Sequence, residues 1–118
     1  MELKYGVDYP DACPPACAIP IEGYFYRLCD NNTPTEHDFK THVDLKIKFP
    51  PKRLCEAKAL SFLKDKESAD KFKKRFPKFK DKKIVSVHIK VEYGISSAVD
   101  RNGHFNFWEY EQAKFLEA

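Results

Sequence analysis

No segment of the 118-residue chain approaches the roughly 20 consecutive apolar residues that a membrane-spanning helix requires. The N-terminal segment MELKYGVDYPDACPP contains no extended apolar region of the kind found in secretory signal peptides. Neither an internal repeat nor a low-complexity tract is present. These features predict a soluble cytoplasmic protein that makes no contact with membranes.

The chain contains only four cysteines, at positions 13, 17, 29 and 55. Without a secretory signal, we expect them to be reduced thiols. A tetrahedral zinc ion could take its ligands from Cys13, Cys17, Cys29 and His37. However, paired cysteines separated by two residues, the usual zinc-knuckle spacing, are not found. We therefore predict no metal site, because free cysteines behave mostly as small apolar residues.

Charged residues make up 33% of the chain and apolar residues 42%, which is typical of a folded protein rather than a disordered one. A chain of this length can bury one core but not two, so we expect a single domain. The net charge of +3 is uneven, since residues 64–83 carry +6 and the rest of the chain carries −3. The molecule should therefore have one basic face.

The clearest structural pattern lies between residues 59 and 92. An apolar run at residues 60–63 and an alternating run at residues 84–92 predict two strands, and the segment between them has a helical period. Asp65 is a good N-cap for this helix, and Pro77 prevents its continuation. The helix has an apolar stripe that should bury against the strands, formed by Ala69, Phe72 and Phe76.

We predict an α+β domain with a twisted, mixed or antiparallel sheet of about five strands. The main helix, near residues 66–76, should pack on one face of the sheet, and a short helix is expected near residues 36–42. The other predicted segments are an extended arm at residues 1–20 before a domain at 21–118, a strand at 23–29, a loop with some strand-like alternation at 44–54, and a hairpin joining 95–99 to 104–108. Residues 109–118 fit either a helix or a closing strand.

Two surfaces are candidates for binding a partner. The first is the basic helix face, where Lys73, Lys74 and Lys78 could contact another protein. Three phenylalanines are interleaved with these lysines, which leaves nucleic-acid binding as an alternative, since exposed rings can stack on bases. The second is the aromatic hairpin, where His104 could form a polar tip above Trp108. His104 is equally consistent with an ordinary hairpin side chain.

Three short strings carry a resemblance: Gly23-x-x-Tyr26-Arg27-Leu28, then Ala59-Leu60-Ser61-Phe62, then Lys66-Glu67-Ser68-Ala69. In this order they resemble short uncharacterised bacterial proteins and, more distantly, the ADP-ribosyltransferase-like fold with its tRNA 2′-phosphotransferase branch. The resemblance implies an NAD-binding enzyme or toxin-like domain in which Arg27 holds the NAD phosphates and Ser61 supports the nicotinamide cleft. A downstream acid would orient the ribose. Glu92, Glu109 and Glu117 are available, and we take Glu109.

No motif in the chain identifies a chemistry. The simplest interpretation is a small accessory or protein-interaction domain without catalytic activity, with another protein as its partner and no cofactor. The first alternative is the transferase-like enzyme, which alone would require NAD. In that alternative, Arg27 pairs with phosphate, whereas otherwise it should form an ion pair with an acid such as Asp30 or Glu56. The second alternative is a nucleic-acid-binding module.

Overall fold

The predicted strand, helix and strand are present, in a computed structural model that describes residues 2–116. The elements are β2 (Leu60–Leu63), α3 (Lys66–Arg75) and β3 (Lys83–Ile89). The Oδ1 atom of Asp65 accepts a hydrogen bond from the backbone N–H of Ser68 at 2.7 Å, which confirms the predicted N-cap. The helix ends at the residue before Phe76, whose backbone is extended ahead of Pro77.

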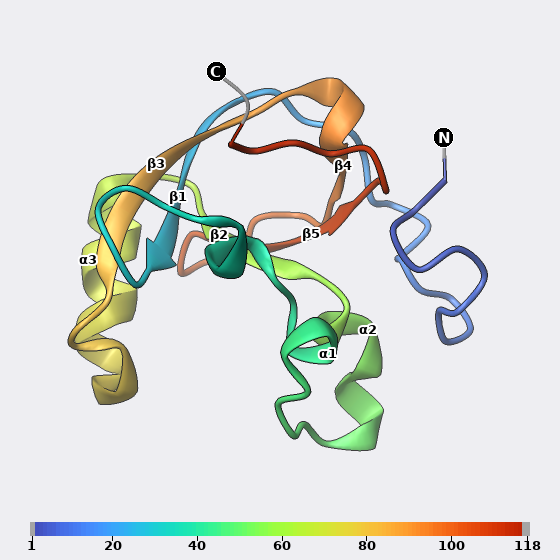
Figure 1. Ribbon diagram of the computed structural model, residues 1–118, viewed down its shortest axis with the longest axis horizontal. Coiled ribbons are helices and arrows are strands. Elements are labelled where there is room, and N and C mark those ends of the chain that lie inside the picture. The colour runs from blue at the N-terminus through green and yellow to red at the C-terminus, as the bar shows by residue number, and fades with distance from the viewer. Residues whose placement is uncertain (1, 117–118) are drawn as a thin grey trace.

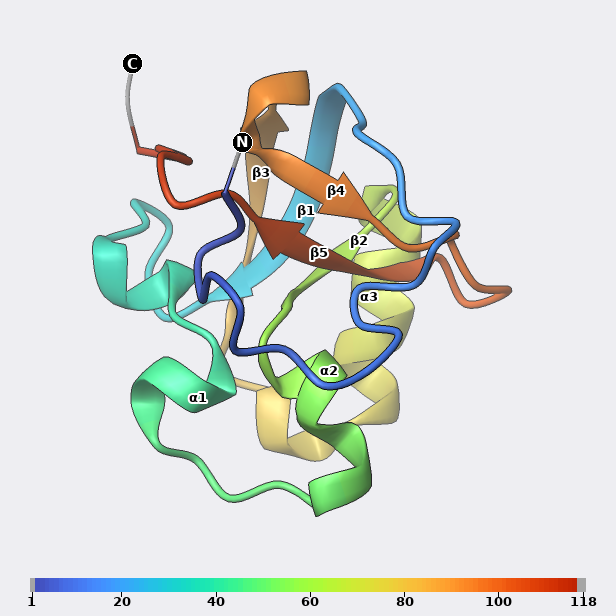
Figure 2. The same cartoon turned by 90° about the vertical axis from the view of Figure 1, so that its right-hand side faces the viewer.

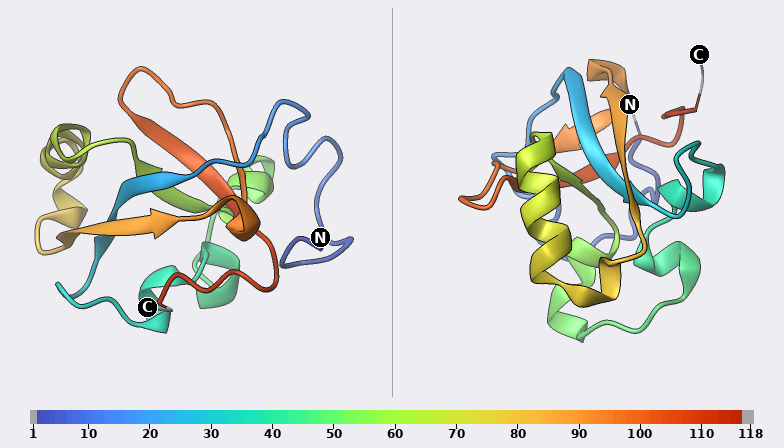
Figure 3. Two further views of the ribbon diagram at one scale, coloured as in Figure 1. Left: turned by 90° about the horizontal axis from the view of Figure 1, so that it is seen from above. Right: turned by 90° about the vertical axis from the view of Figure 1, so that its left-hand side faces the viewer.

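The sheet has five strands in the order β3-β1-β2-β5-β4, and every neighbouring pair is antiparallel. The remaining strands are β1 (Gly23–Cys29), β4 (Gly94–Ser96) and β5 (His104–Glu109). Because β1 lies between β2 and β3, the connection through α3 crosses β1, and the helix packs against all three strands. Figure 3 shows α3 lying along one face of β1 and β3. The predicted α+β class is confirmed.

The two faces of the sheet differ because side chains alternate along each strand. On β2, the side chains of Leu60 and Phe62 are buried whereas Ser61 is exposed. The face opposite α3 carries the main core, whose buried members are Phe39, Leu60, Phe62, Val87, Ile89, Tyr93, Phe105 and Phe107. On the other face, α3 covers only part of the sheet, and the side chain of Ser61 stays accessible.

Short helical turns replace the short helix expected near residues 36–42. They are η1 (Glu36–Phe39), α1 (His42–Leu45), η2 (Pro51–Arg53) and α2 (Leu54–Ala57), with η3 (Pro77–Phe79) and η4 (Val91–Tyr93) later in the chain. Lys40 has extended backbone angles, and Thr41 then caps α1, so a continuous helix over residues 36–42 is wrong. The strand-like alternation at 44–54 is also wrong, since Pro50 and the following turns break it.

The N-terminal arm docks along the domain, beside α2 and β5 (Figure 2). Leu3 forms a bridge with Tyr110, and Ile19 forms one with Ser96 on the edge strand β4. The side chain of Lys58 is buried against the arm and contacts Asp8. In Figure 1 the arm lies at the end of the sheet opposite α3. The arm therefore protects the β4 edge, as a covering segment can do for an exposed strand.

A disulfide between Cys13 and Cys55 joins the arm to α2. The expectation that all four cysteines are reduced is therefore wrong for this pair, whose approach depends on how the arm docks. Cys17 is an exposed free thiol and Cys29 is a buried one. Burial raises the pKa of Cys29 to about 11, so this thiol stays protonated at neutral pH.

Beyond Glu109 the chain turns across the core face rather than forming a helix or strand through residue 116. Phe115 packs there against Phe39 and Tyr93. Met1, Glu117 and Ala118 lie outside the described residues, as do the corresponding ends of the predicted arm and domain. Among residues 2–116, no helix has the length and apolar character needed to cross a bilayer.

The disulfide generates the first testable prediction. Replacing both Cys13 and Cys55 by Ser should lower the free energy of unfolding by about 2–4 kcal/mol. Without the crosslink, the unfolded chain regains the conformational entropy that closing the loop removes. The sequence separation of 42 between the two cysteines makes this loop a substantial part of the chain. Urea unfolding followed by circular dichroism measures the change. The matched control is Cys17→Ser, and equal stability of the double variant and the control would contradict the prediction.

Candidate functional site

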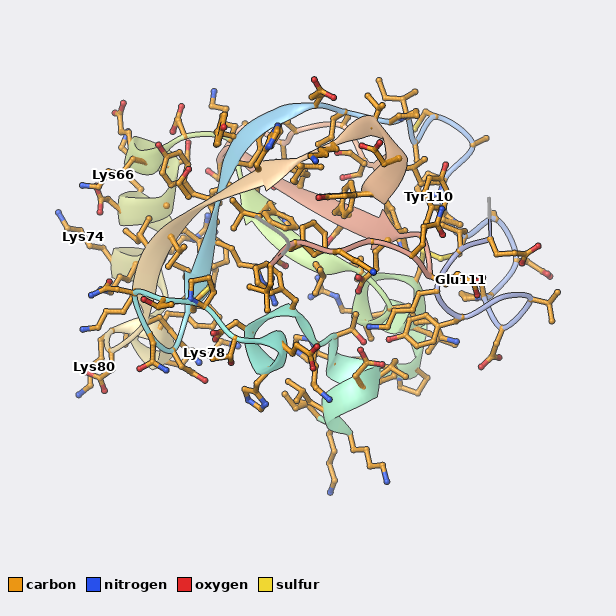
Figure 4. The ribbon with its side chains drawn as sticks, turned by 45° about the horizontal axis from the view of Figure 1, so that its top comes forward. Lys66, Lys74, Lys78, Lys80, Tyr110 and Glu111 are labelled. Carbon is orange, nitrogen blue, oxygen red and sulfur yellow. A yellow bond between two sulfur atoms is a disulfide. The ribbon has the colours of Figure 1, made fainter. Side chains whose placement is uncertain are left out.

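The basic side chains of α3 and η3 gather at one end of the molecule. Figure 4 shows Lys66, Lys74 and Lys80 pointing outward there, with Lys78 nearer the middle of the view, and all four far from Tyr110 and Glu111. We define the basic face as Lys66, Lys73, Lys74, Arg75, Lys78 and Lys80. None of these six forms a salt bridge with another residue in the range 2–116, whereas the neighbouring Lys71 and Lys82 pair with Glu67 and Asp30. The three predicted contact lysines belong to this face, with Lys73 half-buried and Lys74 and Lys78 exposed.

Beneath the basic face lies an aromatic cluster of Phe72, Phe76 and Phe79. The ring centroid of Phe72 lies 4.8 Å from that of Phe76 and 5.6 Å from that of Phe79. All three side chains are half-buried, while Ala69 alone of the predicted stripe is fully buried. The predicted burial of this stripe is therefore complete at Ala69 and only partial at Phe72 and Phe76, which are not part of the main core. They form a second, smaller cluster between α3 and the sheet.

The predicted pairing of His104 with Trp108 does not occur. Residues four apart on a strand are separated by roughly 13 Å. Trp108 is only 2% exposed, and its Nε1–H donates to the carbonyl oxygen of Cys55 on α2 at 3.0 Å. The aromatic neighbour of His104 is Phe72, at a centroid distance of 5.7 Å and an interplanar angle of 8°. The predicted hairpin of β4 and β5 is confirmed, but its aromatic residues lie inside the protein.

The structure brings together two residues that the sequence placed in separate hypotheses. His104 Nε2 lies 3.0 Å from Ser61 Oγ, across the antiparallel pair of β2 and β5. The hydroxyl of Ser61 is exposed, whereas the side chain of His104 is 21% exposed and is held against the Phe72 ring. This pair lies on the α3 side of the sheet, where Phe72 of α3 covers one face of the His104 ring and the Ser61 side chain stays exposed.

Asp100 and Asn106, for which the sequence predicted no role, complete this group. Asp100 Oδ1 accepts hydrogen bonds from the backbone N–H groups of Asn102 and His104 at 2.8 and 3.0 Å. Its other oxygen, Oδ2, lies 3.8 Å from His104 Nδ1. Asn106 is directly opposite Ser61 in the strand register, so both side chains occupy the same face. The alternation of His104 and Asn106 along β5 was the available signal.

The electrostatic surroundings keep His104 neutral at physiological pH. Burial lowers the pKa of His104 below its ordinary value, and Arg53 lowers it further, while Asp100 and Glu56 oppose the shift. The carboxylate facing Nδ1 favours the tautomer with the proton on that nitrogen. Nε2 is then free to accept a hydrogen bond from the Ser61 hydroxyl.

Arg27 makes structural contacts on the core face of the sheet. Its Nε and one terminal nitrogen donate to the carbonyl oxygens of Asp38 and Ser61 at 2.7 and 2.8 Å. The guanidinium also lies 5.8 and 5.7 Å from the ring centroids of Phe39 and Phe62. Burial lowers the pKa of Arg27, and the two carbonyl oxygens take two of its five N–H donors. The expected ion pair is wrong, because Asp30 pairs with Lys82 and Glu56 with Arg53.

Glu109 belongs to a cluster with the N-terminal arm. Lys4 Nζ lies 3.2 Å from Glu109 Oε1 and 2.5 Å from Asp44 Oδ2, and Tyr5 donates a hydrogen bond to Asp44. Burial raises the pKa of Glu109, while Lys4 opposes this shift. A groove of about 710 Å³ opens beside this cluster. Because the charges of the cluster already pair with one another, we assign no ligand to the groove.

The three residues that the resemblance implied do not converge. Strand alternation places Arg27 and Glu109 on the core face and the Ser61 hydroxyl on the α3 face. Of the other acids named, Glu92 lies in η4 and Glu117 is outside the described residues. Arg27 reaches only the backbone carbonyl of Ser61.

The zinc ligands considered for Cys13 and its neighbours do not gather either. Cys13 is bonded to Cys55, Cys17 is exposed, and Cys29 is buried in the sheet. His37 lies 3.9 Å from Asp30 on the surface. Within residues 2–116, no group of three His, Cys, Asp or Glu side chains is arranged to hold a metal ion.

No protein-family model, curated protein or solved structure matches this chain. The resemblance to the ADP-ribosyltransferase-like fold therefore stays a prediction.

The second prediction concerns the charge state of His104. Its pKa, measured by NMR titration of the ring protons, should lie below 6.5, and Asp100→Asn should lower it further by removing a negative charge. Because the unfolded state binds this proton more readily, the stabilising contribution of His104 is present above pH 6.5 and is lost as the pH falls through the folded-state pKa. A rise in the pKa of His104 in the variant would contradict the assignment.

Proposed function

We propose that the chain is a small interaction domain whose basic face captures an acidic surface of another protein. The observation that supports this function is the gathering of six cationic side chains that form no salt bridge within residues 2–116, on α3, on η3 and at the C-cap of η3, in a molecule whose net charge is only +3. Unpaired surface cations attract an oppositely charged partner and accelerate its encounter. The function requires no cofactor and no membrane.

The α3 helix is well suited to hold these cations in a fixed arrangement. Asp65 caps its first turn, and the negative charge of Glu67 lies near its N-terminus. The aromatic cluster below anchors the helix and η3 to each other through Phe72 and Phe79. A partner therefore meets a pre-formed surface, which reduces the conformational entropy lost on binding.

The aromatic cluster favours a protein partner over nucleic acid. The rings of Phe72 and Phe79 are stacked on each other, and Phe72 also stacks on His104. Lys78 and Arg75 lie over the rings of Phe79 and Phe76. These faces are already occupied, whereas sequence-tolerant binding of single strands relies on rings that are free to stack on bases. Lysine also dominates the face, although arginine is better shaped for bidentate phosphate contacts.

Two features of the chain point to different cellular compartments. A cytoplasmic location is the expectation from the sequence, but the Cys13–Cys55 disulfide favours an oxidising compartment, because cytosolic reductants keep most thiols reduced. The proposed binding function depends on neither compartment. Thiol alkylation of the protein immediately on cell lysis would distinguish them, since only the reduced pair would be modified.

The third prediction tests the basic face with defined probes. A fluorescent glutamate-rich peptide should bind the purified chain, and Lys73→Glu, Lys74→Glu and Lys78→Glu together should weaken binding about tenfold or more, mainly by slowing association. Rising salt should weaken binding by the wild-type protein more than binding by the variant. Fluorescence anisotropy and stopped-flow mixing provide the affinity and the rates.

The matched control reverses the charge of three exposed lysines elsewhere by Lys→Glu substitution, at positions 40, 48 and 114. This control has the same net charge as the test variant, so equal losses in both would indicate an effect of overall charge alone and would contradict the assignment. Short RNA and DNA duplexes serve as parallel probes. If they bound through the basic face and the acidic peptide did not, the nucleic-acid alternative would replace the proposal.

A further inference from the structure

On the exposed part of the sheet, Ser61, His104 and Asp100 are arranged as in sites that activate a serine hydroxyl. Ser61 Oγ is within hydrogen-bonding distance of His104 Nε2, at 3.0 Å, and it is exposed to an incoming substrate. The imidazole is held from two sides, by the parallel Phe72 ring and by the Asp100 carboxylate opposite Nδ1. A nucleophile, a base and a group that orients the base are the parts that nucleophilic catalysis by serine requires.

The carboxylate is itself fixed in place. Asp100 Oδ1 accepts from two backbone N–H groups of its own loop, which leaves Oδ2 facing the imidazole. Gly103, with a φ of 79°, closes this loop against Ser68 on α3, where a side chain at position 103 would have no room. The Oδ2–Nδ1 distance of 3.8 Å is longer than a hydrogen bond, as is common before substrate tightens a catalytic site.

We propose that Ser61 and His104 hydrolyse short-chain carboxylic esters, with Asp100 as the positioning residue and the side-chain amide of Asn106 as the donor to the developing oxyanion. Asn106 stands directly across the strand pair from Ser61. A substrate carbonyl placed at Ser61 Oγ is then within reach of this amide, since directly opposed side chains are about 5 Å apart. This activity is independent of the proposed binding role of the basic face.

The reaction proceeds in two balanced steps. Ser61 Oγ bonds to the carbonyl carbon of the ester while its proton passes to His104 Nε2, and the alcohol then leaves with that proton as its bond to the acyl carbon breaks. In the second step a water molecule attacks the acyl group, again giving a proton to His104. The carboxylic acid departs, and Ser61 Oγ recovers the proton from His104. The sum is ester plus water to acid plus alcohol.

The fourth prediction tests this activity on the full chain with a fluorophosphonate probe and with p-nitrophenyl acetate. The probe should label one residue, which peptide mass spectrometry would identify as Ser61, and p-nitrophenol should be released in a burst. Ser61→Ala should abolish both signals, and His104→Gln should slow labelling by about a hundredfold or more, the usual contribution of a general base. Circular dichroism establishes that each variant is folded.

The matched control is Ser86→Ala. Ser86 is also an exposed serine on a strand, but it forms no hydrogen bond with a histidine among the described residues. Labelling should be unchanged in this variant. The proposal is overturned if the folded wild-type protein is not labelled, if labelling persists in Ser61→Ala, or if the mapped site is another residue.

The role of Asp100 requires a readout other than activity alone. Asn at position 100 keeps the side-chain oxygen that accepts from the loop backbone but removes the charge that faces Nδ1. Asp100→Asn should therefore slow labelling by about tenfold or more, and it should shift the acidic limb of the pH–rate profile to lower pH. The other charged groups that act on His104 are Glu56 and Arg53, which stay unchanged. An unchanged pH–rate profile would show that Asp100 does not act on His104.

Discussion

The arrangement of the sheet depends on the guanidinium of Arg27. β1 and β2 share only one registered residue pair, so backbone pairing alone does little to hold them together. Arg27, on β1, donates hydrogen bonds to the carbonyl oxygens of Ser61 on β2 and Asp38 on η1, and it lies between the rings of Phe39 and Phe62. Removing a guanidinium from water is costly unless its donors are satisfied. The two hydrogen bonds of Arg27 therefore link β1 to both β2 and η1.

The position of β2 determines what remains open on the opposite face. α3 packs over the β1 and β3 side, and α2 covers Trp108 near the end of β5. Ser61, His104 and Asn106 lie on this face between α3 and α2. His104 also stacks on Phe72, which belongs to the helix that carries the basic face.

The sequence predicted the features that depend on neighbouring residues. The cap at Asp65, the stop at Pro77 and the alternation of β3 are local, and all three are present. The features that the sequence did not reveal depend on chain segments meeting in space. The partner of Cys13 could not be found without knowing that the arm docks beside α2, and the burial of Trp108 depends on the same helix.

The same reasoning separates the two catalytic hypotheses. The resemblance grouped Arg27, Ser61 and Glu109 by their order along the chain, but strand parity decides which side chains share a face. A shift of one residue in register moves every side chain of a strand to the other side. With Ser61 opposite Asn106, the partners available to the hydroxyl from β5 are the even-numbered residues, and Glu109 faces the core. Of these residues, His104 is within hydrogen-bonding distance of the Ser61 hydroxyl, and Asn106 stands directly opposite Ser61 in the register.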